Sequence, residues 1–389
     1  MKLIYITNAR IPTEKAHGLQ IMKMCEAFAR NGLDVELIIP KRINPIKQDS
    51  FEYYGVKKIF NIRKIFCVDL FPLKLVPETI SFYLQALSFS KIAVLCALFK
   101  YGRKDNVFYS RDYITLFFLC LLGFNPVAEI HDYRSEKPRR WLRFIFKRAR
   151  KIAVNSEGTL ELINEHYKLD PQKCFVVPNG VDVDFFNISE SREEARNQLK
   201  TPENKVIVGY VGRLETSGRE KGVSSLLRAF GRLFESRKDC LLYIVGGPNE
   251  LIEKYKSELG GWGVSPESVV FVGQVEYKKI PLYLRALDIL VITAPDEARY
   301  AATTSPIKLF EFLAAGKAIV APSLPSIRTI LNEENCLFFE AGNPQDLAEK
   351  IGWLIDNRPL REKLSQRAHE DVRQYSWVRR AGKIMDFIC

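Results

Sequence analysis

The 389-residue sequence has eight cysteines, and no two of them lie close together. Zinc clusters and dithiol redox motifs place their thiols within a few residues of one another, so this spacing argues against both kinds of site. Scattered thiols of this kind are typical of reduced, intracellular proteins. The cysteines therefore predict a cytoplasmic protein.

Long hydrophobic runs are also missing. The most apolar stretches, Ser88 to Phe99 and Ile114 to Val127, are shorter than the roughly 20 residues that a membrane-spanning helix needs. The N-terminal MKLIYITNARIPT has a short apolar run and no small-residue cleavage site, which predicts a first strand and not a signal peptide. We expect buried helices in both apolar stretches.

Acidic residues are outnumbered by basic ones, with 46 Asp and Glu against 58 Lys and Arg, and the formal net charge is +12. An excess of this sign favours anionic partners, namely nucleotide phosphates, an acidic membrane surface or nucleic acid. Charge by itself does not choose among the three.

Strands and helical segments alternate along the chain, and the pattern occurs twice. We expect twelve strands, six in each half: Leu3 to Thr7, Val35 to Ile39, Val107 to Tyr109, Val127 to Ile130, Ile152 to Asn155, Phe175 to Val177, Val206 to Val211, Leu241 to Val245, Val269 to Val272, Ile289 to Ile292, Ala318 to Ala321 and Leu337 to Phe339. Such alternation predicts an α/β fold with doubly wound parallel sheets. We expect an N-terminal Rossmann-like domain over residues 1–185, a polar linker over 186–204, a second Rossmann-like domain over 205–370, and a C-terminal helix over 371–389 that crosses back to the first domain. Since open α/β sheets bind ligands at the carboxyl ends of their strands, two facing domains would share a cleft.

Several motifs in a fixed order resemble the group-1 retaining glycosyltransferases of GT-B fold, which use nucleotide-sugar donors. In chain order they are KAHGLQIMKMCEAFARNGLDVELI, EIHD, VPNGVD, VGRLETSGREKG and SPIKLFEFLAAGKAIVAP, followed by YSW near the C-terminus. The resemblance covers essentially the whole chain. It implies two facing domains, the first binding the acceptor and the second binding the nucleotide sugar.

The first motif contains Gly18, in a loop where a glycine lets backbone N–H groups approach a phosphate at a helix N-terminus. An ordinary βα turn would also explain this glycine, but the resemblance implies a role at the donor diphosphate. His131 in EIHD ends a strand, where the resemblance implies a catalytic or sugar-positioning histidine. A lone histidine is often structural, and we interpret His17, His166 and His369 as surface or loop residues.

Arg213 follows the first strand of the second domain, and Lys221 comes shortly after it. The resemblance implies that these cations clamp the donor diphosphate and stabilise the leaving group. Two cations held close to the departing diphosphate can stabilise the negative charge that develops on it, as a bound metal ion does in other enzymes. We therefore expect a metal-independent enzyme without a cofactor. A surface arginine is the alternative for Arg213.

The last motif begins with Ser305 as a favoured N-cap and Pro306 as a favoured first helical residue, which together form an end that attracts anions. Lys308 and Glu311 share a face of this helix. They could form a solvated ion pair. The resemblance implies instead that Glu311 binds the ribose hydroxyls of the donor, and Lys308 is a candidate cation near its phosphates.

The resemblance also implies a first glutamate eight positions before Glu311, but Thr303 stands there. This departure puts the contacts with the donor sugar in doubt. Asp296 and Glu297, in the preceding loop, are expected to line the sugar pocket, and either could replace the missing carboxylate.

Residues Lys137 to Lys151 hold eight basic residues and no acidic one, interleaved with aromatic and aliphatic residues. A basic amphipathic helix of this kind suits an anionic membrane surface, and together with the apolar and basic stretch from Asn61 to Phe99 it suggests a lipid-linked acceptor. A core helix with a solvated basic face is the alternative. No nucleic-acid module is recognisable, so no nucleic-acid partner is expected.

The combined prediction is a retaining glycosyltransferase, cytoplasmic or peripheral on the inner face of the membrane. It would move a sugar from a UDP- or GDP-sugar to a glycan or lipid-linked acceptor in cell-surface polysaccharide biosynthesis. A catalytically weak, nucleotide-sugar-binding partner subunit and a nucleotide-sugar epimerase of the same fold are alternatives. A nicotinamide-dependent dehydrogenase is a poor explanation, because no G-x-G-x-x-G turn follows the first strand.

Overall fold

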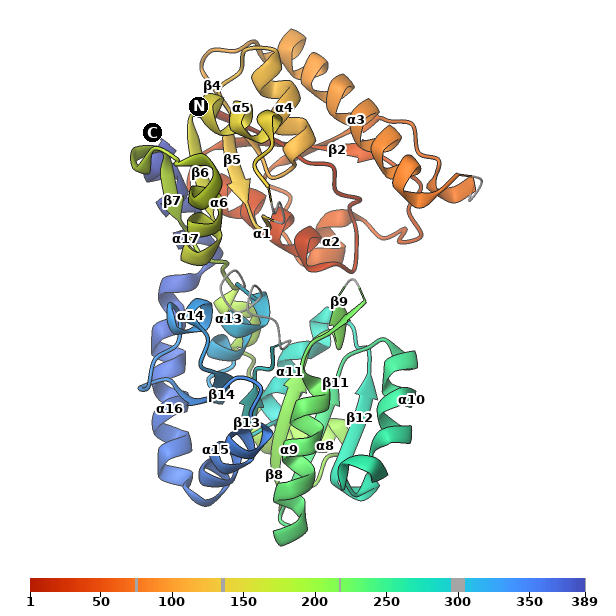
Figure 1. Cartoon of the computed structure of the whole chain (residues 1–389), viewed down its shortest axis with the longest axis vertical. Coiled ribbons are helices and arrows are strands. Elements are labelled where there is room, and N and C mark those ends of the chain that lie inside the picture. The colour runs from red at the N-terminus through yellow and green to blue at the C-terminus, as the bar shows by residue number, and fades with distance from the viewer. Residues whose placement is uncertain (74–75, 134–136, 217, 295–304, 389) are drawn as a thin grey trace. The chain divides into compact units, whose positions relative to one another are not determined.

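The structure, a computed structural model, describes residues 1–73, 76–133, 137–216, 218–294 and 305–388. It divides into two compact units (Figure 1). Unit 1 comprises Met1–Asn179 together with Trp377–Cys389, and unit 2 comprises Gly180–Ser376. Each unit is built on its own parallel sheet covered by helices, which confirms the expected α/β class.

Unit 1 contains a seven-stranded parallel sheet in the order β3-β2-β1-β4-β5-β6-β7. The strands are β1 (Lys2–Ile6), β2 (Asp34–Lys41), β3 (Asn61–Phe66), β4 (Asn106–Ser110), β5 (Val127–Ile130), β6 (Lys151–Val154) and β7 (Cys174–Val176). The strand order reverses between β1 and β4, and such a switch point is where open α/β sheets bind ligands. The edge strand β3 was not predicted, because its exposed and half-buried residues give it no apolar run.

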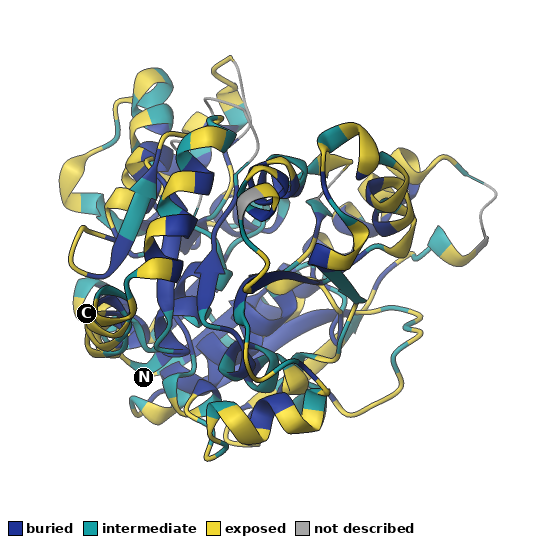
Figure 2. Ribbon diagram, turned by 90° about the horizontal axis from the view of Figure 1, so that it is seen from below, coloured by how far each residue is buried: buried dark blue, intermediate teal, exposed yellow. Residues whose placement is uncertain are grey.

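Helices cover both faces of this sheet. One face carries α3 (Glu78–Tyr101), α4 (Tyr113–Leu121) and α5 (Arg140–Arg148). The opposite face carries α1 (Ala16–Arg30) and α17 (Trp377–Ile388), which pack against each other. The short helix α2 (Ser50–Tyr54) follows β2, and α6 (Glu157–Tyr167) connects β6 to β7. The central strands are buried, and the helices are exposed on their outer sides (Figure 2).

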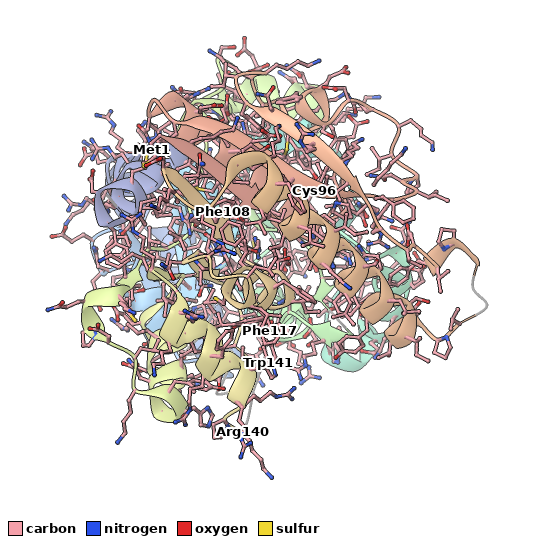
Figure 3. All side chains as sticks on the ribbon, turned by 90° about the horizontal axis from the view of Figure 1, so that it is seen from above. Met1, Cys96, Phe108, Phe117, Arg140 and Trp141 are labelled. Atoms are coloured by element: carbon pink, nitrogen blue, oxygen red, sulfur yellow. The ribbon has the colours of Figure 1, made fainter. Side chains whose placement is uncertain are left out.

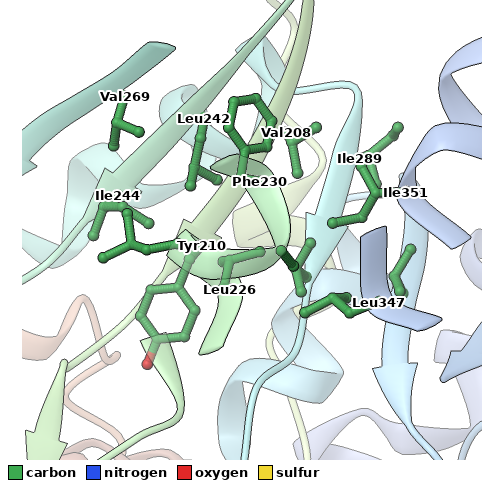
Figure 4. Close-up of a cluster of buried hydrophobic side chains, with 14 of the residues drawn as sticks. Val208, Tyr210, Leu226, Phe230, Leu242, Ile244, Val269, Ile289, Leu347 and Ile351 are labelled. Atoms are coloured by element: carbon green, nitrogen blue, oxygen red, sulfur yellow. The ribbon is translucent and has the colours of Figure 1, made fainter. Parts of the chain in front are cut away.

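Unit 2 contains a six-stranded parallel sheet in the order β12-β11-β8-β13-β14-β15. The strands are β8 (Val206–Val211), β11 (Cys240–Val245), β12 (Val269–Gly273), β13 (Ile289–Val291), β14 (Ala318–Pro322) and β15 (Cys336–Phe339). A small antiparallel hairpin, β9 (Glu215–Thr216) with β10 (Arg219–Glu220), follows β8. The apolar side chains of the sheet pack against α9 (Val223–Ser236) and α15 (Pro344–Asp356) to form one half of the core (Figure 4).

The other face of this sheet is covered by α13 (Ile307–Ala314), with α11 (Ile280–Ala286) and α7 (Val183–Phe186) beside it. The remaining helices of unit 2 are α8 (Arg192–Leu199), α10 (Asn249–Glu258), α14 (Pro325–Arg328) and α16 (Arg358–Asp371). Single turns of 3-10 helix include Tyr277–Lys279, before α11, and Val372–Tyr375, after α16.

The unit boundary differs from the boundaries that we expected from composition. Residues 186–204 are not an extended linker, because they contain α8, which packs against α11. The Arg196 side chain is fully buried and donates hydrogen bonds to Ala286 O at 2.9 Å and to Asp288 Oδ2 at 2.6 Å. The polar residues that suggested a linker thus bond within unit 2. At the C-terminal end, residues 371–376 stay with unit 2, and α17 belongs to unit 1.

Candidate functional site

Unit 1 has a cavity of about 490 Å³ at the carboxyl ends of β1, β4 and β5. Its position follows from the topology, since these strands meet at the switch point of the sheet. The lining is polar on one side and includes two histidines, an arginine and two aspartates: it consists of Thr7, Asn8, Ala9, His17, Ile21, Arg111, Asp112, Tyr113, Ile130, His131 and Asp132.

His131 lies where the sequence predicted it, directly after β5 and in the wall of this pocket. Its Nε2 is 2.9 Å from Glu129 Oε1. Burial, together with the positive charge of Arg111, lowers the pKa of His131 to about 4. The ring is therefore neutral at pH 7, so it can exchange a hydrogen bond with a sugar hydroxyl without carrying a charge.

Glu129, which supports His131, is held by a network beneath the pocket. The C-terminal helix α17 supplies Arg380, whose Nη2 donates to Glu129 Oε1 at 2.6 Å. Gln20 Nε2 donates to the same oxygen at 3.2 Å, and Tyr5 OH donates to Oε2 at 3.4 Å. Burial opposes ionisation of Glu129, but Arg380 and His131 nevertheless hold its pKa well below its usual value. The carboxylate is thus a fixed, paired charge.

Three residues of the pocket, His17, Arg111 and Asp112, were not predicted as site residues. His17, which we expected at the surface, lines the pocket from the first turn of α1, and burial together with Arg111 lowers its pKa to about 4. Arg111 donates from Nη1 to Gln20 Oε1 at 2.6 Å. Asp112 Oδ2 accepts a hydrogen bond from the Asn8 backbone N–H at 2.5 Å. Arg111 and Asp112 follow β4 as His131 follows β5, so applying the strand-end rule to YSRD would have found them.

Gly18 lies buried in the first turn of α1. A Cβ at this position would collide with the hydroxyl of Tyr54 and lie 2.6 Å from Thr13 Cγ2. The Gly18 backbone N–H donates to Lys15 O at 3.0 Å. Close packing therefore accounts for the glycine, and its N–H is engaged within the turn. A role of Gly18 in donor binding stays a prediction.

The second cluster of predicted residues lies in unit 2, after β8. Arg213 is exposed there, and its carbonyl oxygen accepts a hydrogen bond from Tyr210 OH at 2.6 Å. Lys221 directly precedes Gly222, the N-cap of α9. Glu220 was not predicted, yet its carboxylate caps α9 by accepting hydrogen bonds from the backbone N–H groups of residues 222, 223 and 224. Glu220 therefore fixes the backbone beside Lys221.

The helix α13 carries Lys308 and Glu311. Its N-cap is Pro306, in an extended conformation with ψ at 128°, and the helix begins at Ile307. The prediction of Ser305 as N-cap was therefore wrong by one residue, because Pro306 takes the extended geometry that a cap requires. Asp296, Glu297 and Thr303, the other candidates near this helix, lie outside the described residues.

Lys308 is buried at its charged end. Its Nζ is inaccessible to solvent, has no hydrogen-bond partner among the described residues, and lies 4.1 Å from the centroid of the Tyr210 ring. Burial and the neighbouring charge of Lys221 lower the pKa of Lys308 to about 7. A cation of this kind gains from a bound anion, because an anion offsets both the desolvation and the repulsion.

Glu311 accepts a hydrogen bond from Tyr277 OH at 3.1 Å, and the Tyr277 ring is stacked on Phe185. Burial raises the pKa of Glu311 to about 7. The alternative of a solvated ion pair between Lys308 and Glu311 is therefore wrong, since both groups are withdrawn from water. A carboxylate in this position can accept hydrogen bonds from two neighbouring hydroxyl groups of a ligand.

Two family models match the chain, one in each half. The model for glycosyl transferases group 1 matches residues 191–371, and the model for Glycosyltransferase Family 4 matches residues 18–185. The chain belongs to the group-1 glycosyltransferase family. The Arg213, Lys221, Lys308 and Glu311 cluster lies within the first match, and the His131 pocket lies largely within the second.

Relatives of this group-1 family member align over part of the chain. The D-inositol 3-phosphate glycosyltransferase of Corynebacterium glutamicum is 25% identical over 241 residues, which cover 60% of this chain and 55% of that protein. The phosphatidyl-myo-inositol mannosyltransferase of Mycobacterium leprae is 32% identical over 210 residues, with coverages of 54% and 51%. The chain thus spans about half the length of the curated relatives it matches.

Solved structures similar to this family member cover nearly all of it. The Anabaena protein HepE in complex with UDP gives a TM-score of 0.74 at 16% identity over 99% of both chains. WaaG, a glycosyltransferase involved in lipopolysaccharide biosynthesis, gives a TM-score of 0.68 at 17% identity, also over 99% of both chains. This member of the group-1 family has the GT-B fold.

Proposed function

We propose that this protein is a glycosyltransferase that binds a nucleoside-diphosphate sugar in unit 2 and an acceptor in the His131 pocket of unit 1. The observation that carries the proposal is the buried ammonium group of Lys308 near Lys221, with a pKa lowered to about 7. Two cations that repel each other in a partly dry site favour a ligand that brings negative charge. A diphosphate supplies that charge.

In the proposed arrangement, Lys221, Lys308 and Arg213 bind the diphosphate, and Glu311 accepts hydrogen bonds from the ribose hydroxyls. During transfer the bond from the anomeric carbon to the diphosphate oxygen breaks, the acceptor hydroxyl oxygen bonds to that carbon, and the proton of that hydroxyl passes to the departing diphosphate. The charge that develops on the departing diphosphate is stabilised by the same cations. We propose that the reaction is independent of metals, because these cations can stabilise the leaving group as a Lewis acid would. We also propose that the reaction retains the configuration at the anomeric carbon, as the resemblance to the retaining glycosyltransferases implies.

His131 acts on the acceptor side of this proposal. Its neutral ring lines the unit 1 pocket, and Glu129 holds it from below. A neutral imidazole accepts or donates one hydrogen bond to a sugar hydroxyl. His17 and Asp112 offer further polar contacts in the same pocket. We therefore propose that His131 orients the reacting sugar or its acceptor.

The donor is proposed to be a UDP- or GDP-sugar, and the acceptor a glycan or a lipid-linked saccharide of a cell-surface polymer. Support for a uridine nucleotide comes from HepE, which was solved with UDP and with UDP-glucose. Support for a lipid-linked acceptor comes from the Mycobacterium leprae relative, which is named as a phosphatidyl-myo-inositol mannosyltransferase. The proposed location is the cytoplasm, at the inner face of the membrane.

Thermal shift with UDP, GDP, ADP and their sugars tests donor binding. A nucleotide at a hundredfold its Kd stabilises a protein by about 2.7 kcal/mol. We expect one nucleotide to raise the Tm of wild type, and Lys221→Met and Glu311→Gln to abolish most of that increment. Lys317→Met is the matched control, because Lys317 lies in the same unit but donates to Arg285 O instead of facing the proposed site.

The control variant should keep the nucleotide-induced increment even if its own Tm is lower. If no nucleotide shifts wild type, or if all three variants respond alike, the proposed donor site is wrong. Product analysis then separates the remaining alternatives. A binding subunit gives a shift but no product, and an epimerase converts the donor without any acceptor.

A further inference from the structure

Exposed apolar side chains are concentrated on α3. Of the exposed large hydrophobic residues in the described part of the chain, six belong to this one helix: Ile80, Phe82, Tyr83, Leu84, Leu87 and Phe99. Phe99 is 86% exposed, and the other five are between 43% and 54% exposed. We call these six residues the α3 patch. Five of them lie within residues 80–87, and Phe99 lies near the C-terminal end of the helix. A concentration of exposed apolar side chains marks an interaction site on a soluble protein.

The inner side of α3 already packs in the core of unit 1. Phe89, Ala93 and Ala97 are fully buried against the sheet, and Ser90 Oγ lies 2.9 Å from Thr115 Oγ1 on α4. In the part of the chain that the structure describes, α3 is the helix long and apolar enough to cross a membrane by length and composition, and 39% of that apolar window is buried inside the protein. The helix is therefore a core helix whose outer side is apolar as well.

The helices α4 and α5 lie beside α3, and α4 adds to the exposed apolar surface. Figure 3 shows α3, α4 and α5 side by side, with Cys96 on α3, Phe117 on α4, and Trp141 and Arg140 on α5. Leu121 on α4 is 54% exposed. The ring centroids of Phe117 and Phe144 lie 5.8 Å apart, so aromatic side chains of α4 and α5 pack against each other.

The third helix, α5, contributes charge and not apolar surface. Its apolar residues Leu142, Ile145 and Phe146 are buried in unit 1, so the basic segment cannot insert in a bilayer as an independent amphipathic helix. Its outer side is cationic instead, and the exposed basic residues on α5 and its flanks are Lys137, Arg139, Arg140, Arg143, Lys147, Arg148 and Arg150. No acidic residue lies between Lys137 and Lys151.

We propose that α3, α4 and α5 form a docking surface for an anionic lipid bilayer. The α3 patch would enter the boundary between headgroups and acyl chains, and the cations of α5 would bind the anionic headgroups. Stable peripheral binding needs two such signals, since neither a modest apolar area nor a basic cluster suffices separately. The cationic edge also distinguishes a lipid surface from a second copy of this chain, because two like-charged edges would repel each other.

The docking surface is connected to the unit 1 pocket through the inner side of α3. Gln85, fully buried, donates from Nε2 to Asn8 Oδ1 at 2.7 Å, and Asn8 lines the pocket. One helix therefore carries the α3 patch on one side and contacts the pocket wall on the other. The link between the docking surface and a lipid-linked acceptor in the pocket rests on the proposed function. Binding of the docking surface to the bilayer does not rest on it.

Flotation of the purified full chain with vesicles tests the docking surface. We expect wild type to float with vesicles of phosphatidylcholine and phosphatidylglycerol, and weakly with phosphatidylcholine alone. Leu84→Ser/Leu87→Ser should lower the partition coefficient about tenfold, and Arg140→Glu/Arg143→Glu should remove the dependence on the anionic lipid. Trp353→Ser and Arg358→Glu, exposed residues of unit 2, are the matched controls.

Unchanged thermal unfolding and nucleotide-induced Tm shifts show that each variant is folded and that the donor site is intact. The proposal is overturned if wild type does not float, or if the α3 and control variants float equally. It is also overturned if wild type is a dimer that the α3 variant converts to a monomer without any vesicle binding. If wild type floats with the vesicles but binds no nucleotide, the proposed function is wrong and the docking surface is supported.

Discussion

Unit 1 and unit 2 both bury charged groups near the carboxyl ends of their strands, but they pair these groups differently. In unit 1, Glu129 is fully buried, accepts a hydrogen bond from Arg380 at 2.6 Å, and has a pKa well below its usual value. In unit 2, the ammonium group of Lys308 has no hydrogen-bond partner among the described residues, and its pKa is lowered to about 7. Among the described residues, Glu129 is thus a paired carboxylate, whereas the ammonium group of Lys308 is buried without a hydrogen bond.

This difference indicates different tasks. A paired carboxylate fixes its neighbours, so the pocket around His131 is preorganised and keeps its charge when a ligand enters. Lys308 and Glu311 sit near the midpoint of their titrations, so a bound anion or hydroxyl changes their protonation. These differences fit the proposed function, in which unit 1 binds an acceptor and unit 2 binds a nucleoside-diphosphate sugar.

The largest effect is expected from Arg380→Met, which removes the cation that pairs with Glu129. A buried charge that loses its partner costs about 3–5 kcal/mol of folding free energy. Thermal or denaturant unfolding should show this loss, whereas Arg379→Met, an exposed change at the neighbouring position, should leave stability nearly unchanged. Equal effects of the two variants would mean that the Glu129 network does not stabilise the packing of α17 on the rest of unit 1.

Lys308→Met should have the opposite sign on stability and a clear effect on binding. Replacing a buried ammonium by an apolar side chain removes a desolvation cost, so the ligand-free protein should be as stable as wild type or more so. Nucleotide affinity should fall by about 1.5–3 kcal/mol, the typical contribution of a charged hydrogen bond. Calorimetric titration measures the affinity, and a thermal scan measures the stability.

A matched comparison for this variant is Lys317→Met, since Lys317 is also a largely buried lysine of unit 2 but donates to Arg285 O at 2.8 Å. That variant should lose stability and keep nucleotide affinity. If Lys308→Met destabilises the ligand-free protein as much as Lys317→Met does, Lys308 is a structural residue, and the contrast between the two units fails.

The fold could be predicted from the sequence because buried parallel strands are read directly as short apolar runs. All twelve expected strands are present, from β1 at Lys2–Ile6 to β15 at Cys336–Phe339. The strand β3 was not predicted, because it lies at the sheet edge and its residues are all exposed or half-buried. The segment around α8 was misread because Arg192 and Arg196 bond to Asp288 elsewhere in unit 2, which composition does not show.

The site was predictable to the extent that residues follow strand ends. His131 and Arg213 follow β5 and β8, but the resemblance to the family made them and Lys221 candidates, and their roles stay predictions. Arg111 follows β4 and was open to the reasoning from strand ends. What the sequence could not show is pairing. That Arg380 reaches Glu129 across 251 positions, or that Glu220 caps α9 beside Lys221, depends on tertiary contacts. Burial of Lys308 and Glu311 decided against a surface ion pair, and burial is likewise a tertiary property.

Per pH unit, the smallest predicted effect is the pH dependence of stability, and it sharpens the contrast between the units. Glu311 has a folded pKa of about 7, above its ordinary value of 4.5, so the stability that it contributes is present below pH 4.5 and is lost as the pH rises through 7. Lys308 has a folded pKa of about 7, below its ordinary value of 10.5, so its contribution is present above pH 10.5 and is lost as the pH falls through 7.

Together these two groups contribute a minimum of stability near pH 7 to the ligand-free protein, with slopes of at most about 1.4 kcal/mol per pH unit for each proton. His17 and His131, whose pKa values are lowered from 6.5 to about 4, have the opposite effect on the acidic side, because the stability that they contribute is lost as the pH falls from 6.5 through 4. The minimum is therefore measured as the difference between wild type and a variant that lacks both Lys308 and Glu311. The Lys308→Met/Glu311→Gln variant should flatten this minimum, as should saturating nucleotide, because a bound diphosphate keeps Lys308 charged. Denaturant unfolding at acidic, neutral and mildly alkaline pH measures the profile. Glu129 adds slope only near and below pH 4.5, where the unfolded carboxylate takes up a proton, so it does not affect the difference near pH 7. If the stabilities of wild type and the double variant differ by the same amount at every pH, Lys308 and Glu311 do not titrate near pH 7, and the contrast between the two units fails.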